Sequence, residues 1–277
     1  MCPVCRARLE LRPGVVRCVR GHGFDVAKQG YVSLLLGSQA PGTADSPAMV
    51  AARASFLATG LYAPLAHAIA ETVAALAQQR GRAVVVDAGV GTGYYLAAVL
   101  DEVDGAAGVA FDVSKHAVRR AARAHGRIGA FVADVWRPLP IADEVADVVL
   151  NVFAPRNGPE FARILRPGGA LVVVTPAKDH LSPLVAELGL LSVDEDKERR
   201  VAESLRDFAE IERRAVEFEM MLTHDQITEV VGMGPSAWHS DAQQQATRIA
   251  KFPRQTLAKA SFHLSIFKVD PRSRPLP

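Results

Sequence analysis

Between residues 83 and 175, short apolar runs alternate with stretches in which apolar positions recur every three or four residues. The short runs, bounded by glycine and polar residues, predict buried strands, and the periodic stretches predict helices. The expected strands span residues 83–87, 108–112, 129–133, 147–153 and 169–175, and the expected helices span residues 94–101, 115–125 and 158–165. This alternation favours an α/β fold with a doubly wound, largely parallel sheet.

The segments on either side of this region contain further periodic elements. Before it, Ser46 and Pro47 have the types preferred at an N-cap and first helical position. The other expected elements are a helix from Pro47 to Gly60, a helix from Leu61 to Gln79, strands Ala215–Leu222 and Ser261–Lys268, and a helix capped by Thr223 that closes at Gly232. Residues 83–277 are therefore expected to form one large domain, and residues 36–82 a linker with helices that lead into it.

The first 35 residues differ from the rest, because they are rich in proline and glycine and too short to hold a hydrophobic core. All three cysteines of the chain, Cys2, Cys5 and Cys18, lie here, and His22 follows Cys18 by four positions. Two closely spaced pairs of sulfur and nitrogen ligands are typical of a structural, four-coordinate zinc site. We predict a zinc-binding module over residues 1–35.

The charge of the chain is unevenly distributed, although its formal net value is only +2. Residues 1–35 contain six basic and two acidic residues, a formal charge of +4, so the remainder carries −2. With three thiolates and one zinc ion the module would still carry +3, which favours phosphate binding. Arg17 and Arg20 are the candidate RNA contacts; the alternative interpretation is a solvated basic surface.

A glycine-rich loop follows the first expected strand. Asp87 ends that strand, Gly89, Gly91 and Gly93 alternate behind it, and Tyr94 begins the next helix. Glycines let the backbone approach a ligand, and the helix N-terminus exposes unpaired N–H groups. The spacing differs from the dinucleotide fingerprint, whose last two glycines are three positions apart, so a nicotinamide or flavin cofactor is disfavoured.

Two further acids end the next two strands. Asp112 lies nineteen residues after Gly93, where a carboxylate suits ribose hydroxyls. Asp134, followed by Val135, is placed to accept from an adenine amino group. Each acid alone is more often a turn or cap residue. Together with Asp87 beside one glycine loop, they predict a nucleoside cofactor.

These features resemble the class I S-adenosylmethionine (SAM)-dependent methyltransferases, particularly the glycine loop, Asp112, Asp134 and the segment Leu165–Val172. Together with the cysteine cluster, nearly the whole chain is similar to the 23S ribosomal RNA guanine-N1 methyltransferases, including the macrolide-resistance branch of actinobacteria. The most specific stretches are Gly23–Tyr31, Met49–Arg53, Asp112–Lys115, Asn151–Pro155 and Thr175–Leu181.

The resemblance implies a Rossmann-like methyltransferase domain, SAM and Zn²⁺ as cofactors, and cofactor contacts from Tyr62, Gly93, Tyr94 and His180. We add Asn151 to the expected cofactor-binding residues. Phe153, at the end of the fourth strand, could stack on a target base. From the residues alone, Tyr62 and Phe153 are equally well explained as core aromatics.

The resemblance further implies methylation of guanine N1 in a hairpin loop of 23S ribosomal RNA, with macrolide resistance as a consequence in that branch. Loss of the N1 proton calls for an acceptor. The candidates are His180, His239, Asn151 and acids at the sheet edge. Two alternatives stay open: a small-molecule methyltransferase with a structural zinc clip, and a non-enzymatic zinc module that binds nucleic acid.

Composition completes these expectations. Hydrophobic residues make up 49% and charged residues 22% of the chain, and its apolar runs are of strand length. The chain begins without a charged leader followed by an apolar run. We therefore expect a cytoplasmic protein with no membrane partner. A homodimer stays open.

Overall fold

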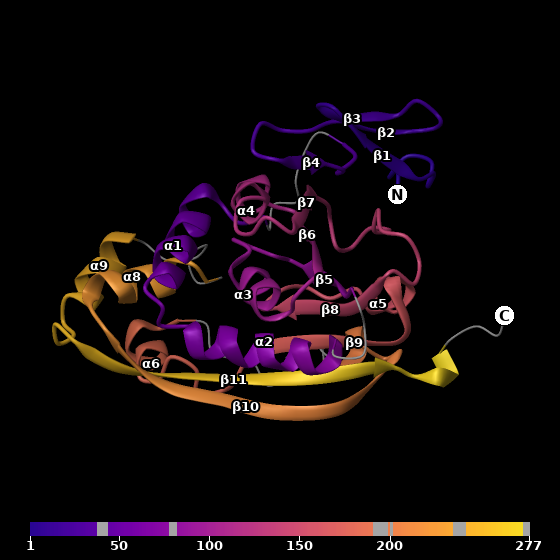
Figure 1. Cartoon of the computed structure of the whole chain (residues 1–277). Coiled ribbons are helices and arrows are strands. Elements are labelled where there is room, and N and C mark those ends of the chain that lie inside the picture. Colours follow the sequence, from indigo (N-terminus) through magenta and orange to yellow (C-terminus); the bar gives the residue numbers. More distant parts are fainter. Residues whose placement is uncertain (38–43, 78–81, 191–198, 200–201, 235–241, 274–277) are drawn as a thin grey trace.

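The computed structural model describes residues 1–37, 44–77, 82–190, 199, 202–234 and 242–273. Its largest feature is an eight-stranded sheet with the strand order β10-β11-β9-β8-β5-β6-β7-β4 (Figure 1). The strands are β4 (Tyr31–Ser33), β5 (Val84–Ala88), β6 (Ala107–Asp112), β7 (Ile128–Val132), β8 (Ala146–Val152), β9 (Leu165–Pro176), β10 (Phe208–Leu222) and β11 (Thr256–Val269).

Six of these strands are parallel, and β11 and β10 extend the sheet in antiparallel pairing beyond β9. The chain winds outward from β5 in both directions, to β6 and β7 on one side and to β8 and β9 on the other. All seven residues of β8 are buried, as a parallel strand covered on both faces should be. The doubly wound α/β sheet predicted from the sequence is confirmed. Ligands of such sheets bind at the carboxyl ends of the strands, where the winding reverses.

Helices cover both faces of the sheet (Figure 1). One hydrophobic cluster joins helices α1 to α4, α6 and α8 to one face, and a second cluster joins α5 and part of the N-terminal segment to the other. The described helices are α1 (Pro47–Ala58), α2 (Ala63–Ala77), α3 (Tyr94–Glu102), α4 (Lys115–Ala121), α5 (Gly158–Ile164), α6 (Leu184–Leu188), α8 (His224–Gly232), α9 (Ala242–Ile249) and the short 3₁₀ turn η2 (Pro271–Ser273).

The N-terminal segment forms a small antiparallel sheet of β1 (Leu9–Arg12), β2 (Val15–Cys18) and β3 (Gly23–Asp25). The chain then enters β4, which pairs in parallel with β7 and is the edge strand of the large sheet. Side chains of the small sheet, including Val16 and Phe24, pack against the second hydrophobic cluster. The zinc-binding segment is thus joined to the large domain by both chain connection and packing.

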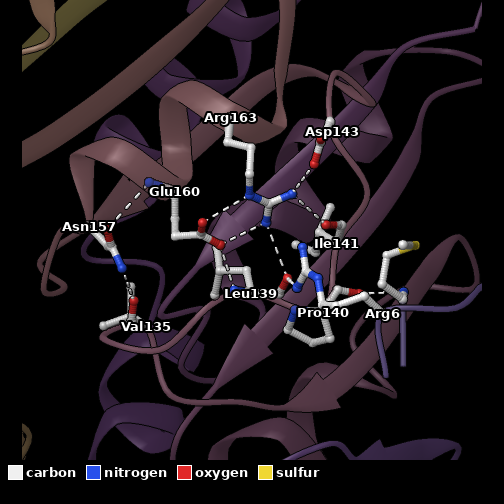
Figure 2. Close-up of polar contacts among 10 residues, drawn as sticks. Arg6, Val135, Leu139, Pro140, Ile141, Asp143, Asn157, Glu160 and Arg163 are labelled. Atoms are coloured by element: carbon white, nitrogen blue, oxygen red, sulfur yellow. Dashed lines mark hydrogen bonds and ion pairs between the residues drawn. The ribbon is translucent and has the colours of Figure 1, made fainter. Parts of the chain in front are cut away.

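A second link joins this segment to the loop that follows Asp134 (Figure 2). Nη1 of Arg6 donates to the carbonyl oxygen of Leu139 at 2.7 Å. The N-terminal ammonium group of Met1 donates to the carbonyl oxygen of Pro140 at 2.6 Å. Arg163 of α5 supports the same loop, since its guanidinium donates to the carbonyl of Ile141 at 2.9 Å. The loop is therefore held between the N-terminal segment and α5.

Most differences from the sequence-based expectations concern the bounds of elements. The helix expected to reach residue 125 ends at Ala121, and the one expected to reach residue 165 ends at Ile164, where β9 begins. The tail strands are longer than predicted, because they pair with each other along almost their whole length. The expected end of the second helix, Gln79, lies outside the described residues.

Among the described residues, no single helix is long and apolar enough to cross a bilayer. Helices α1 and α2 reach the required length and composition only as a pair, which is bent by 86°.

Candidate active site and metal centre

Cys2, Cys5, Cys18 and His22 converge in the small sheet, with all four ligand atoms within 4.8 Å of one another. The sulfurs of Cys5 and Cys18 are 3.7 Å apart, and Nδ1 of His22 lies 3.4 Å from the sulfur of Cys18 and 3.7 Å from that of Cys2. A tetrahedral zinc ion with the usual bond lengths sets two sulfurs about 3.8 Å apart, and a sulfur and a nitrogen about 3.6 Å apart. The four residues therefore fit Zn²⁺ as a closed structural site.

A cavity with a volume of about 780 Å³ lies at the carboxyl ends of the parallel strands, beside the reversal between β5 and β8. Ten of the residues expected to contact cofactor or RNA line it: Tyr62, Asp87, Gly89, Gly91, Tyr94, Asp112, Asp134, Val135, Phe153 and His180. A volume of this size is typical of a site for a cofactor-sized ligand.

The glycine loop connects β5 to α3 and requires glycine for reasons visible in its packing. Gly89 has φ +81°, and a Cβ there would lie 2.4 Å from Cβ of Ala154. Gly93 has φ +85°, and a Cβ there would lie 2.9 Å from Cα of Ala121 in α4. Gly93 is not among the cavity-lining residues. It lets the N-terminus of α3 approach α4, so its contact with the cofactor stays a prediction.

Asp112 holds the glycine loop against the end of β6. Its Oδ2 accepts from the backbone N–H of Gly91 at 3.0 Å, and its Oδ1 accepts from that of Ser114 at 2.8 Å. Burial raises the pKa of Asp112 above its usual value. The carboxylate is thus fixed at the cavity wall, and its contact with a ribose diol stays a prediction.

Asp87 lies under the same loop and is 2% exposed. Burial, and secondly the charge of Asp112, raises the pKa of Asp87 to about 8. Its Oδ1 has no hydrogen-bond partner in the described part of the chain. A buried carboxyl oxygen without a partner, beside a cavity, indicates that a ligand or water completes its contacts.

Asp134 and Val135 begin the loop that follows β7. Oδ1 of Asp134 accepts from the backbone N–H of Trp136 at 3.0 Å, and the carbonyl of Val135 accepts from Nδ2 of Asn157 at 2.7 Å. The second contact ties this loop to the N-terminus of α5 (Figure 2). Trp136 also lines the cavity and is 64% exposed. Sequence reasoning missed this residue, although it directly follows the predicted pair.

Tyr62 and His180 come from α1–α2 and from the segment after β9. The Tyr62 hydroxyl lies 3.2 Å from Nε2 of His180, and Nδ1 of His180 accepts from the backbone N–H of Ser261 at 3.3 Å. Because a backbone N–H only donates, neutral His180 carries its proton on Nε2. Both ring nitrogens are therefore engaged, which disfavours His180 as the general base and favours a positioning role.

Asn151, buried near the carboxyl end of β8, does not line the cavity. Its Nδ2 donates to the carbonyls of Ala88 and Pro155 at 3.1 and 3.0 Å. Asn151 thus joins the end of β5 to the segment after β8. An amide in this role positions its neighbours and is a poor proton acceptor. Its contact with the cofactor stays a prediction.

Phe153 has the most unusual backbone of the predicted site residues. Its φ is +55°, a conformation rarely adopted by aromatic residues, and its side chain is 44% exposed at the cavity. Strained backbone of this kind clusters at functional sites. One side of the ring contacts Tyr95 and Phe262, at centroid distances of 6.2 and 5.4 Å. The open remainder of the ring is available to a ligand.

Two arginines in the cavity wall were also missed. Arg53 forms an ion pair with Asp45 and donates to the carbonyl of Met233 at 2.9 Å, which ties α1 to the residue that ends α8. Arg156 has a buried Nε without a partner in the described chain, and burial lowers its pKa to about 10. Arg53 lies in one of the stretches that carried the family resemblance, but Arg156 had no signal beyond its position after Pro155.

Two of the predicted RNA contacts lie away from this cavity. Arg17 and Arg20 are exposed on the zinc-binding segment, and no residue of that segment lines the cavity. His239, a candidate proton acceptor, lies outside the described residues.

The residues present fit SAM. The loop glycines allow close backbone approach, Asp112 offers a fixed carboxylate for ribose, Asp134 offers one for an adenine amino group, and Asp87 has an unsatisfied oxygen. Most of the cavity surface is apolar, and buried side chains such as Val152, Leu181 and Val230 contribute to it.

Comparison with known proteins agrees with both halves of this description. Residues 1–37 match the zinc-ribbon family described as "RlmA, N-terminal", and residues 85–169 match the family described as "Methyltransferase domain". A solved SAM-dependent methyltransferase from Thiobacillus denitrificans, in complex with S-adenosyl-L-homocysteine, is 17% identical, with a TM-score of 0.46 over 73% of this chain and 91% of that one.

Two relatives match almost the whole chain. The 23S rRNA (guanine(748)-N(1))-methyltransferase of Streptomyces fradiae is 51% identical over 91% of this chain and 90% of its own length. A Micromonospora griseorubida protein designated a 23S rRNA (guanine-N(1)-)-methyltransferase is 48% identical over 96% of each chain. With the zinc cluster and the cofactor cavity in place, this chain belongs to the 23S rRNA (guanine-N1)-methyltransferase family.

Proposed function

We propose that this protein transfers a methyl group from SAM to N1 of a guanine in 23S ribosomal RNA. The observation that carries the proposal is the similarity to guanine-N1 methyltransferases across both the zinc-binding segment and the cavity. The Streptomyces fradiae relative is named for guanine 748, so the equivalent guanine in a hairpin loop is the first target to test. Macrolide resistance in the host would be a consequence of that modification.

SAM, when bound, supplies an activated methyl group on a sulfonium. The chain contributes alignment and exclusion of water, which are the main sources of catalysis in an in-line displacement. Asp112 and the glycine loop would hold the nucleoside end of SAM, and the pair Tyr62–His180 supports the wall of the cavity. Phe153 and Trp136, both exposed at the cavity, offer ring faces on which a flipped base can stack.

Guanine N1 carries a proton that must leave around the transfer. His180 has both ring nitrogens engaged, and Asn151 is a buried amide. Among the described candidates this leaves the carboxylates of the cavity. Asp87 lines the cavity with an Oδ1 that has no partner in the described chain, and burial raises its pKa to about 8, close to the pH at which an acceptor must work.

The zinc-binding segment is proposed to position the RNA, with Arg17 and Arg20 meeting phosphates. We also propose that residues 1–35, 36–82 and 83–277 act as RNA-recognition module, connecting helices and methyltransferase domain. A cytoplasmic location follows from the proposed substrate. A homodimer stays a prediction, which sedimentation velocity checks.

A direct test incubates the protein with labelled SAM and equal amounts of 23S and 16S rRNA transcripts. Label in 23S alone supports the proposal. Binding of SAM by calorimetry without label in any RNA would favour the small-molecule methyltransferase. No SAM binding at all would favour the non-enzymatic zinc module.

A further inference from the structure

Helix α4 carries a concentration of basic side chains outside the cavity and outside the zinc-binding segment. Lys115, Arg119, Arg120 and Arg123 are exposed, and no hydrogen bond or ion pair to the described part of the chain involves their side chains. Residues 113–124 contain no acidic residue. We call these four residues the α4 basic row.

The positions within the row place its charges on one surface. Lys115, Arg119 and Arg123 are spaced four residues apart, so they follow one another along one side of the helix and the turn that ends it, with a rise of about 6 Å between neighbours. Like charges at this spacing destabilise a helix, and Lys115 at the N-terminus opposes the helix dipole. Arg119 and Arg120 lie in the last turn and interact favourably with the same dipole, but the repulsion within the row opposes this gain, so helix stability alone does not account for the row.

The row lies beside the cavity and beside the zinc-binding segment. Asp112 and Val113, which line the cavity, immediately precede α4. Arg119, Arg120 and Arg123 line an open groove between helices α1 to α4, and this groove shares Leu57, Thr92 and Tyr94 with the cavity wall. The groove also contains Asp101 and Glu102 of α3, so its positive charge is concentrated on the α4 side.

The edge strand β4 connects the two basic regions. It contacts β3 of the zinc-binding segment and also contacts α4 (Figure 1). Exposed cations therefore occur on both sides of this edge, with Arg17 and Arg20 on the segment and the basic row on α4. The remaining chain outside residues 1–35 has a formal charge of −2, so the row is a local exception and not the average of the domain.

We propose that the α4 basic row binds the phosphate backbone of the RNA next to the target guanine. This inference rests on the proposed function for its ligand, a polyanion whose base enters the adjacent cavity. Unpaired arginines and a lysine in series match the phosphates of a nucleic-acid strand, and their mutual repulsion falls when the phosphates bind. The contact fixes the register of the RNA without reading its sequence.

The test compares two double variants that each remove two positive charges. Arg119→Gln with Arg123→Gln alters the row, and Arg82→Gln with Arg206→Gln is the control. Arg82 and Arg206 are exposed and have no partner in the described chain; Arg82 precedes the central strand β5, at the end of the parallel strands opposite the cavity, and Arg206 precedes the edge strand β10. Glutamine has nearly the helix propensity of arginine, so α4 should remain folded.

RNA affinity is measured by filter binding of a 23S rRNA transcript to the zinc-loaded protein at several salt concentrations. Each lost phosphate contact reduces the slope of log K against log salt by about 0.7 to 0.9, so the row variant should show a slope smaller by about 1.5. The KM for RNA should rise about tenfold or more at 0.1 M salt, with kcat and SAM affinity unchanged. The control should match the wild type.

Equal slopes for the row variant and the wild type would overturn the proposal and would direct attention to a protein ligand for this surface. Equal losses of RNA affinity in both double variants would also overturn the proposal, because the effect would then depend on net charge and not on the position of the charges. The proposed reaction is judged separately, by product analysis of the wild type. The wild type could transfer no methyl group while the row variant still shows a smaller salt slope than the wild type. In that case the proposed reaction is wrong and the proposed RNA contact is supported.

Discussion

The hydroxyl of Tyr62 lies 3.2 Å from Nε2 of His180, and the same imidazole accepts the backbone N–H of Ser261 through Nδ1. A segment after β9 is thereby fixed between the α1–α2 connection and β11. The side chain of Tyr62 is 1% exposed and packs edge-on against Phe56 and Phe262. These contacts make the pair part of the cavity wall and leave neither imidazole nitrogen free for proton transfer.

Tyr62→Phe and His180→Gln should therefore weaken SAM binding while leaving the pH dependence of kcat unchanged. Removing one such hydrogen bond is worth about 1 kcal/mol, or roughly fivefold to tenfold in affinity. Calorimetry and pH–rate profiles measure the two effects. Loss of one limb of the pH profile in His180→Gln alone would mean that His180 is the base after all.

The buried carboxyl of Asp87 predicts a dependence of stability on pH. Because burial and the charge of Asp112 raise its pKa to about 8, folded Asp87 stays protonated where the unfolded chain has already lost the proton. The contribution of Asp87 to the free energy of unfolding is fully present below pH 4 and is lost as the pH rises towards 8. Asp87→Asn should remove that loss. The Tm of the variant, relative to that of the wild type, should therefore rise as the pH increases from 5 to 8. A constant difference in Tm over this range would contradict the prediction.

Gly89→Ala should be much more destabilising than Gly60→Ala, although both glycines have φ near +80°. At Gly60 a Cβ meets nothing within 4 Å, so only the left-handed conformation is penalised, by about 1–2 kcal/mol. At Gly89 the added clash with Ala154 raises the loss to about 2–5 kcal/mol. Urea unfolding of the two variants measures the difference. Equal losses would show that the loop can move away from β8.

Arg6→Ala should loosen the loop at residues 135–141 without releasing zinc. Arg6 lies next to the zinc ligand Cys5 and donates to the carbonyl of Leu139, in the loop that carries Trp136 (Figure 2). Hydrogen exchange in this loop should accelerate about fivefold or more, which corresponds to about 1 kcal/mol. Arg8→Ala is the control, since Arg8 is exposed and has no partner in the described chain. Elemental analysis should give one zinc per chain in both variants.

The features that were predicted well from the sequence are patterns of residues a few positions apart. The glycine loop, the acids that end β5 and β6, and the cysteine cluster are each local patterns, and the structure brings Asp87 and Asp112 to one cavity wall. Long-range pairing decided the rest. The tautomer of His180 depends on a strand 81 residues away, β4 joins the large sheet through β7, and Arg53 reaches the carbonyl of Met233. No periodicity in a single segment contains such information.

The position of the methyl group tests the central claim most directly. A 23S rRNA transcript treated with the protein and SAM is digested to nucleosides for mass analysis and is also copied by reverse transcriptase. A methyl group at guanine N1 blocks Watson–Crick pairing, so we predict 1-methylguanosine and a stop one nucleotide before a single loop guanine. A product methylated at N2, at N7 or on a sugar, with read-through at that site, would contradict the account.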